Sequence, residues 1–185
     1  MKKSIFLIGL ASFLFYSCAV VRPGEVGVKQ RFGKLKGNPK NQGLVFLNPF
    51  TTVLVKIPTR TVNKEITLNL PSKEGLNVAA KISILYHVKK ENAMNIINEV
   101  GRNYETVLIL STFRSASADV CARFYAKDMH SGKRAEIEQA IKEQMADILK
   151  GRGFVIESVL LKSITLPSGL YSAIEAKLKL SLIHI

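Results

Sequence analysis

Side chains that support catalysis or bind metals are widely scattered in this sequence. The three histidines, His87, His130 and His184, have no Cys, Asp or Glu at a spacing typical of a metal site. The sequence contains no Gly-x-Ser-x-Gly, no His-Glu-x-x-His and no glycine-rich phosphate loop. We therefore expect a non-enzymatic protein with no catalytic residue, no metal and no cofactor.

Three carboxylates lie close together in the sequence, and paired carboxylates can act as general acid and base. Glu136, Glu138 and Glu143 alternate with Lys and Arg on a predicted helix whose other side is apolar. Glu138 and Lys142 are four residues apart, a spacing that supports an ion pair along a helix. We interpret these carboxylates as the charged face of that helix, so they do not indicate an enzyme.

The two cysteines, Cys18 and Cys121, are not expected to form a disulfide. Cys121 falls in a predicted helix, where it is most simply a small buried apolar residue. Cys18 ends the sequence Phe15-Tyr16-Ser17-Cys18, which resembles a bacterial lipobox, although Phe15 and Tyr16 are bulkier than usual. In a lipobox the cysteine is acylated and becomes the mature N-terminus, so Cys18 is a candidate lipidation site.

Cys18 lies near the end of an uncharged, largely apolar run from Ser4 to Val21, which follows Met1-Lys2-Lys3. As a helix these 18 residues would be about 27 Å long, close to the thickness of a bilayer core of about 30 Å. The same residues also match a secretory signal. Residues 1–21 are therefore predicted to be a signal-anchor or transmembrane segment, or a lipoprotein signal, followed by a folded domain over residues 22–167.

The formal net charge of +13 is unevenly distributed. Residues 1–89 carry 14 Lys and Arg against 3 acids, whereas the rest of the chain is nearly balanced. This distribution predicts a membrane-proximal basic surface that attracts anionic lipid headgroups. A solvated basic face is the alternative, and no nucleic-acid-binding module is recognisable. The basic surface comprises Arg22, Lys29, Arg31, Lys34 and Lys36.

Basic residues flank the apolar run on both sides, so the positive-inside rule does not decide its orientation. The signal-like order of its parts favours a domain on the periplasmic side of a bacterial envelope. The predicted localisation is therefore a membrane, with a single N-terminal anchor.

The periodicity of the folded part predicts strands first, then helices, then a final strand. This order indicates an α+β fold with a mixed, mostly antiparallel sheet and helices packed on one face. The apolar stripe of the third helix is expected to pack in the core first and to contact subunits second; it comprises Ile137, Ile141, Met145 and Ile148. The predicted strands are 25–32, 43–47, 53–57, 61–70, 78–88 and 154–166, and the helices are 93–100, 104–124 and 131–150.

Several of these segments resemble one family in the same order. The sequence from Val20 to Val28, followed by Arg31-Phe32-Gly33-Lys34, is similar to the opening of a prohibitin domain. Gly43 to Phe50 is similar to the family's next block, and Arg152-Gly153-Phe154 with Ala173 to Lys177 resembles its end. Residues 20–179 thereby resemble the SPFH/Band 7 superfamily, and within it the bacterial prohibitin-like proteins.

This resemblance implies an N-terminally anchored membrane scaffold that assembles into a homo-oligomer and modulates a membrane AAA protease. In the family, the last helix continues into a coiled coil. Here residues 168–185 begin such a helix but end in Leu180-Ser181-Leu182-Ile183-His184-Ile185, which lacks the expected composition. A monomeric envelope lipoprotein that binds a ligand or partner is the alternative function.

Overall fold

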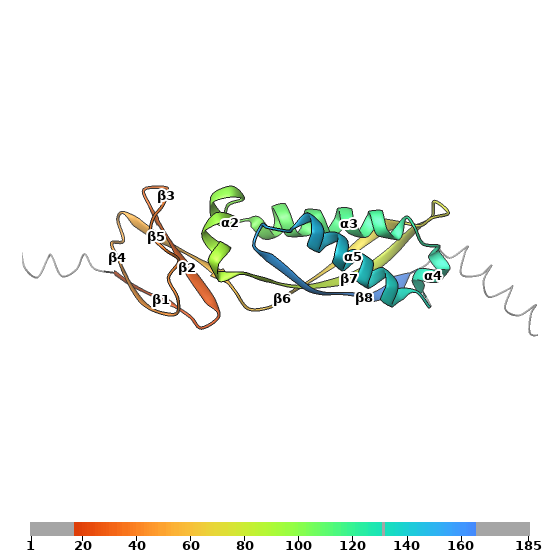
Figure 1. The fold of residues 1–185 in the computed structure, drawn as a ribbon, viewed down its shortest axis with the longest axis horizontal. Coiled ribbons are helices and arrows are strands. Elements are labelled where there is room, and N and C mark those ends of the chain that lie inside the picture. Colours follow the sequence, from red (N-terminus) through yellow and green to blue (C-terminus); the bar gives the residue numbers. More distant parts are fainter. Residues whose placement is uncertain (1–16, 131, 166–185) are drawn as a thin grey trace, which may run out of the picture. The chain divides into compact units, whose positions relative to one another are not determined.

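The computed structural model describes residues 17–130 and 132–165 (Figure 1). Strands dominate the first half, and helices fill most of the second. A short 3₁₀ turn at Lys90–Asn92 lies at the change from strands to helices, and a π-helical segment at Glu105–Leu110 lies among the helices. The strands are β1 (Ser17–Val21), β2 (Glu25–Arg31), β3 (Lys34–Leu35), β4 (Gly43–Leu47), β5 (Thr52–Pro58), β6 (Val62–Pro71), β7 (Asn77–Val88) and β8 (Phe154–Thr165). The helices are α2 (Ala93–Glu99), α3 (Ser111–Cys121), α4 (Ala126–His130) and α5 (Arg134–Ile148).

The described residues form two compact units, and the folded domain over residues 22–167 stays a prediction. The first unit contains residues 17–62, 87–107 and 149–155, and the second contains 63–86, 108–148 without residue 131, and 156–165. The boundaries between the units lie within β6, β7, the π-helical segment and β8, and at the end of α5.

The first unit holds a two-stranded ribbon, β1–β4, and a three-stranded sheet in the order β3-β2-β5. All three pairings are antiparallel. The turn between β1 and β2 has Pro23 and Gly24 at its centre, and the Glu25 amide donates to the Arg22 carbonyl at 3.1 Å. Gly24 has φ +85°, as the third position of a type II turn requires.

Strand β1 corrects the predicted extent of the N-terminal anchor. Residues Ser17–Val21 belong to the folded unit, where they pair with β4 from Ser17 opposite Leu47 to Val21 opposite Gly43. Val21 is 1% exposed. A short apolar run cannot be assigned to helix or strand from periodicity alone, and this one pairs with a strand of equal length. The rest of the predicted anchor lies outside the described residues, as does the segment 168–185.

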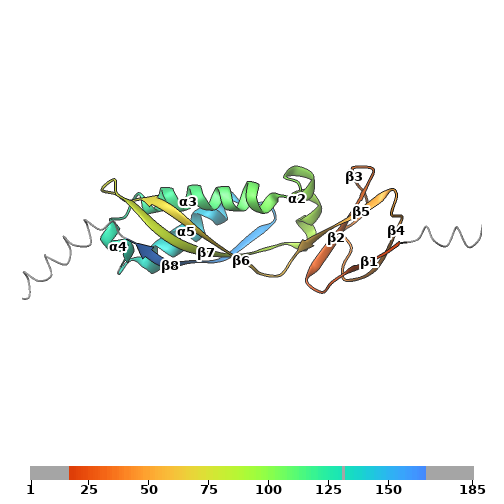
Figure 2. The ribbon, with the colours of Figure 1, turned by 180° about the vertical axis from the view of Figure 1, so that it is seen from behind.

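Helices α3 and α5 lie against one face of a sheet with the strand order β6-β7-β8 (Figures 1 and 2). The antiparallel direction of β6 and β7 follows from two cross-strand contacts. The Ser83 hydroxyl donates to Asn63 Oδ1 at 2.5 Å, and Lys81 Nζ lies 2.9 Å from Glu65 Oε2. Helices on one face were expected, and this arrangement agrees with the sequence prediction. Across the described residues, no helix combines the length and the hydropathy needed to cross a membrane.

Charged side chains of α5 cover the backbone of β8, which lies at one edge of this sheet. The Leu161 amide donates to Glu138 Oε1 at 2.7 Å, and the Leu161 carbonyl accepts from the Arg134 guanidinium. Unpaired groups on an edge strand are otherwise open to pairing with another chain. Glu138, interpreted from the sequence as part of the charged face of this helix, therefore binds the strand.

The apolar stripe of α5 packs into the core of the second unit. Ile137, Ile141 and Met145 are each 0% exposed, so no surface of theirs is available to a neighbouring subunit. This buried position agrees with the first role expected for them and removes the second. Ile148 is 46% exposed, and a subunit contact stays a prediction for this residue alone.

We predict that Ile141→Ala destabilises the chain far more than Ile148→Ala. Removing a fully buried isoleucine side chain leaves a cavity and lowers the free energy of unfolding by about 2–5 kcal/mol. The half-exposed Ile148 serves as the matched control. Urea unfolding of both full-length variants, followed by circular dichroism, measures the difference. Equal midpoints for the two variants would contradict this core assignment.

Candidate functional site

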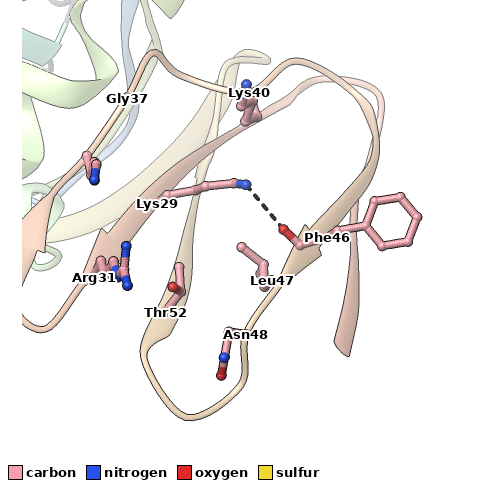
Figure 3. Close-up of a pocket in the computed structure, with 9 residues that line it drawn as sticks. Lys29, Arg31, Gly37, Lys40, Phe46, Leu47, Asn48 and Thr52 are labelled. Atoms are coloured by element: carbon pink, nitrogen blue, oxygen red, sulfur yellow. Dashed lines mark hydrogen bonds between the residues drawn. The ribbon is translucent and has the colours of Figure 1, made fainter. Parts of the chain in front are cut away.

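The first unit gathers basic side chains around a cavity of about 350 Å³ (Figure 3). Three of the five predicted basic-surface residues line it: Lys29, Arg31 and Lys36. Lys40, which the sequence analysis did not single out, is a fourth. We call this cavity the basic cavity; its lining is completed by Gly37, Phe46, Leu47, Asn48 and Thr52. The remaining predicted residues, Arg22 and Lys34, are exposed in the same unit but do not line it.

Backbone hydrogen bonds along the edge of β2 that faces away from β5 position the lysines of the following loop. The Lys36 amide donates to the Lys29 carbonyl at 2.9 Å. The Lys40 amide donates to the Gly27 carbonyl at 2.7 Å, and the Gly27 amide donates to the Lys40 carbonyl at 2.9 Å. The loop thus continues the pairing that β3 begins. Lys36 and Lys40 are held beside the strand that carries Lys29 and Arg31.

The opposite side of the basic cavity comes from β4, the turn after it and the start of β5. Lys29 Nζ donates to the Phe46 carbonyl at 3.2 Å, while the Phe46 ring points away from Lys29 (Figure 3). Asn48 Oδ1 accepts from the Phe50 amide at 3.0 Å, which fixes the turn. The cavity is therefore built from ordered backbone as well as long side chains.

The chemistry of the basic cavity is that of an anion site. Among the nine described residues lining it there is no carboxylate, histidine or cysteine. It supplies three ammonium groups and one guanidinium, the groups that pair most strongly with phosphate and carboxylate oxygens. Within residues 17–130 and 132–165, no cluster of three or more His, Cys, Asp and Glu side chains is placed to hold a metal.

An exposed apolar surface lies on the outer face of the β1–β4 ribbon. Cys18 pairs with Phe46 and Val20 pairs with Leu44, so all four side chains share one face. Val20, Leu44 and Phe46 are 53%, 67% and 70% exposed. We call these four residues the apolar ribbon face. A strand pair with one face on a core normally turns polar residues outward, and this pair does not.

Two turns of the same unit present further exposed aromatic rings. Phe50 is 73% exposed in the β4–β5 turn, and Phe32 is 74% exposed in the two-residue turn between β2 and β3. Phe32 and Gly33 both have positive φ, at 46° and 81°, as a type I′ turn requires. A bulky side chain is strained in this conformation, so the fold alone does not account for a phenylalanine there.

The two cysteines have opposite environments, and only the burial of Cys121 was expected from the sequence. Cys121 is buried in α3, and burial raises the pKa of its thiol to about 11, so the thiol stays protonated at neutral pH. Cys18 is an exposed free thiol on the apolar ribbon face. Lipidation of Cys18 stays a prediction.

Sequence reasoning missed the residues that form the apolar surface of this unit. Gly43–Leu47 has apolar residues at both alternating positions, which in a short strand indicates that both faces are covered. This pattern is visible in the sequence, and it indicates that Leu44 and Phe46 are apolar residues on the second face of the strand. Lys40 carried no such signal, because only its backbone pairing with Gly27 brings it beside Lys29.

Comparison with known proteins gives two matches. The sequence profile described as SPFH domain / Band 7 family matches residues 19–182. Prohibitin 1 of Drosophila melanogaster is 22% identical over 147 residues, which cover 80% of this chain and 53% of that protein. The chain therefore spans about half the length of the curated relative that it matches.

We predict that Phe32→Asn stabilises the fold. Asparagine tolerates positive φ, so the substitution relieves a backbone strain of about 1–2 kcal/mol. Phe50→Asn is the control, because it removes an equally exposed ring from a residue whose φ is not positive. Urea unfolding should give a higher midpoint for Phe32→Asn than for wild type. The midpoint of the control should stay at the wild-type value. An unchanged or lower midpoint for Phe32→Asn would contradict the strain argument.

Proposed function

This chain belongs to the SPFH domain / Band 7 family, and on that premise we propose that it is a membrane-anchored, non-enzymatic scaffold. In this proposal the chain assembles into an oligomer of prohibitin type, organises other membrane proteins and modulates a membrane AAA protease. The first unit contacts the bilayer on the periplasmic side of a bacterial envelope. The observation that carries the membrane contact is the apolar ribbon face.

The apolar ribbon face supports this proposal through the free energy of burial. Contiguous exposed apolar side chains on a folded protein mark a surface for a membrane or a partner. Burying a leucine or phenylalanine side chain contributes about 1.5–3 kcal/mol, and Leu44 and Phe46 are both about two-thirds exposed. Both side chains, with Val20, would lie in the interface between headgroups and acyl chains.

The nearby cations support a membrane rather than an uncharged protein as the contacted surface. Each Lys or Arg close to an anionic leaflet contributes about 1 kcal/mol of attraction. The basic cavity brings four of them to the unit that carries the apolar ribbon face. Apolar side chains combined with cationic ones are the composition of interfacial membrane-binding segments.

The membrane contact and the N-terminal anchor would act together. An interfacial patch alone binds a bilayer reversibly, and stable attachment takes a second signal. In the proposal the segment before β1 supplies that signal, and the patch sets the orientation of the first unit. Assembly would then concentrate many such patches on one area of membrane, which raises their combined affinity.

We predict that the full-length chain, extracted in mild detergent, forms a complex of many subunits. Light scattering coupled to size exclusion should give a protein mass several times the 20.5 kDa of one chain. Sedimentation with membranes before extraction tests the anchor in the same preparation. A protein mass of one chain would contradict the oligomeric part of the proposal.

A second candidate, a monomeric envelope lipoprotein that binds a ligand or partner, is favoured by the position of β1. With Ser17–Val21 in a strand, the uncharged run before it shortens to the 13 residues from Ser4 to Tyr16. That length matches the apolar core of a signal peptide better than a span of about 20 residues. Cys18 then stands just after this run, exposed on the apolar ribbon face.

For this candidate we predict that the wild-type chain incorporates labelled fatty acid and that Cys18→Ala does not. The variant should also leave the membrane fraction, because the acyl group would be its attachment. Cys121→Ala is the control, since that thiol is buried and unavailable for modification. A Cys18→Ala chain that stays membrane-bound at the wild-type level and unprocessed would exclude the lipoprotein.

A further inference from the structure

We propose that the basic cavity is a binding site for the phosphate-bearing headgroup of an anionic lipid. The inference rests on the proposed membrane contact and adds the lipid class to it. It concerns a defined pocket of nine residues, distinct from general attraction between a basic surface and a charged leaflet.

The first argument is the unbalanced charge of the basic cavity. Lys29, Arg31, Lys36 and Lys40 bring four formal positive charges to its lining, and the nine described lining residues include no carboxylate. Arg31 also stands directly opposite Lys34 across the β2–β3 pair, an arrangement of like charges that destabilises a sheet. A bound anion offsets this repulsion, so the site is complementary to a phosphate group.

The second argument is the supply of hydrogen-bond donors. A Lys ammonium carries three N–H groups, and Lys29 uses one of them to bind the Phe46 carbonyl. Its other two remain for a ligand, and the Arg31 guanidinium provides a planar pair suited to two phosphate oxygens. The Thr52 hydroxyl and the Asn48 amide group lie on the lining as further polar partners.

The third argument selects a lipid over a free anion. A cavity of about 350 Å³ lies at the lower end of the range for small-ligand sites, which is enough for a headgroup and too little for acyl chains. Phe46 belongs to both the basic cavity and the apolar ribbon face, with its carbonyl toward Lys29 and its ring away from it (Figure 3). Acyl chains attached to a bound headgroup would therefore meet exposed apolar side chains close by.

The test compares lipid retention by full-length variants in native mass spectrometry. The chain is released from neutral detergent that contains equimolar dioleoyl-phosphatidylglycerol and dioleoyl-phosphatidylcholine. Wild type should retain the anionic lipid preferentially. Lys36→Gln with Lys40→Gln should reduce that preference about 30-fold, because two cations at the bound phosphate are lost. Both lysines are exposed, so the double variant is expected to fold.

The matched control removes two positive charges from the same unit outside the basic cavity. Lys56 and Lys90 are exposed and do not line it, so Lys56→Gln with Lys90→Gln should change the preference less than about twofold. Equal losses in the two double variants would overturn the proposal in favour of a diffuse basic surface. No preference for phosphatidylglycerol in wild type would overturn it directly.

Competition with small phosphates distinguishes the source of the anion. Millimolar glycerol 3-phosphate or inorganic phosphate should not displace the retained phosphatidylglycerol. Displacement by either would assign the basic cavity to a soluble anion and overturn the lipid assignment. Oligomer mass and membrane sedimentation, measured on the same variants, report on the proposed scaffold separately. The preference for the anionic headgroup can be lost while oligomer mass and membrane sedimentation stay at wild-type values. Oligomer mass or sedimentation can likewise change while the headgroup preference stays.

Discussion

The antiparallel pairing of β1 with β4 determines which side chains of the first unit face outward. Side chains alternate between the faces of a strand, so the register from Ser17 opposite Leu47 to Val21 opposite Gly43 fixes both faces at once. Val21 and Val45 turn into the core, while Val20, Leu44 and Phe46 turn out. A slip of one residue would exchange the two sets. Both sets are apolar, so the outer face of this strand pair is apolar as well.

The same pairing places the elements that build the basic cavity. The type II turn at Pro23-Gly24 carries the chain from β1 into β2, whose residues Lys29 and Arg31 form one wall. The turn after β4, fixed by Asn48, leads into β5 and completes the other wall. The β1–β4 pair carries the apolar ribbon face, and the turns next to it lead into the strands that line the basic cavity. Cationic and apolar groups therefore occur in one unit. The second unit turns its apolar stripe into its own core instead, where Ile137, Ile141 and Met145 are fully buried.

Much of the fold could be predicted from the periodicity of apolar residues. The family could be predicted from short sequence segments that occur in the family's order. Strand β4 begins and ends at the predicted residues, and the alternation of β7 and the stripe of α5 agree with the structure. The resemblance found around Val20–Val28 and Gly43–Phe50 is confirmed by the family match over residues 19–182. Strand β1 was hidden because its residues continue an apolar run whose period does not distinguish helix from strand. The place of Lys40 in the site depends on tertiary pairing with Gly27, and the bond from Glu138 to β8 depends on packing of a distant helix.

In the proposed function, the apolar ribbon face lies in a membrane interface. The chain contains no tryptophan, so a single Phe46→Trp substitution provides a fluorescent reporter at that face. The full-length variant, reconstituted in vesicles, should emit at shorter wavelength than in water and be quenched by lipids brominated on their acyl chains. Tyr125→Trp, at a residue of the second unit that is 44% exposed, should show neither effect. Water-like emission and no quenching at position 46, or equal quenching at both positions, would contradict the account.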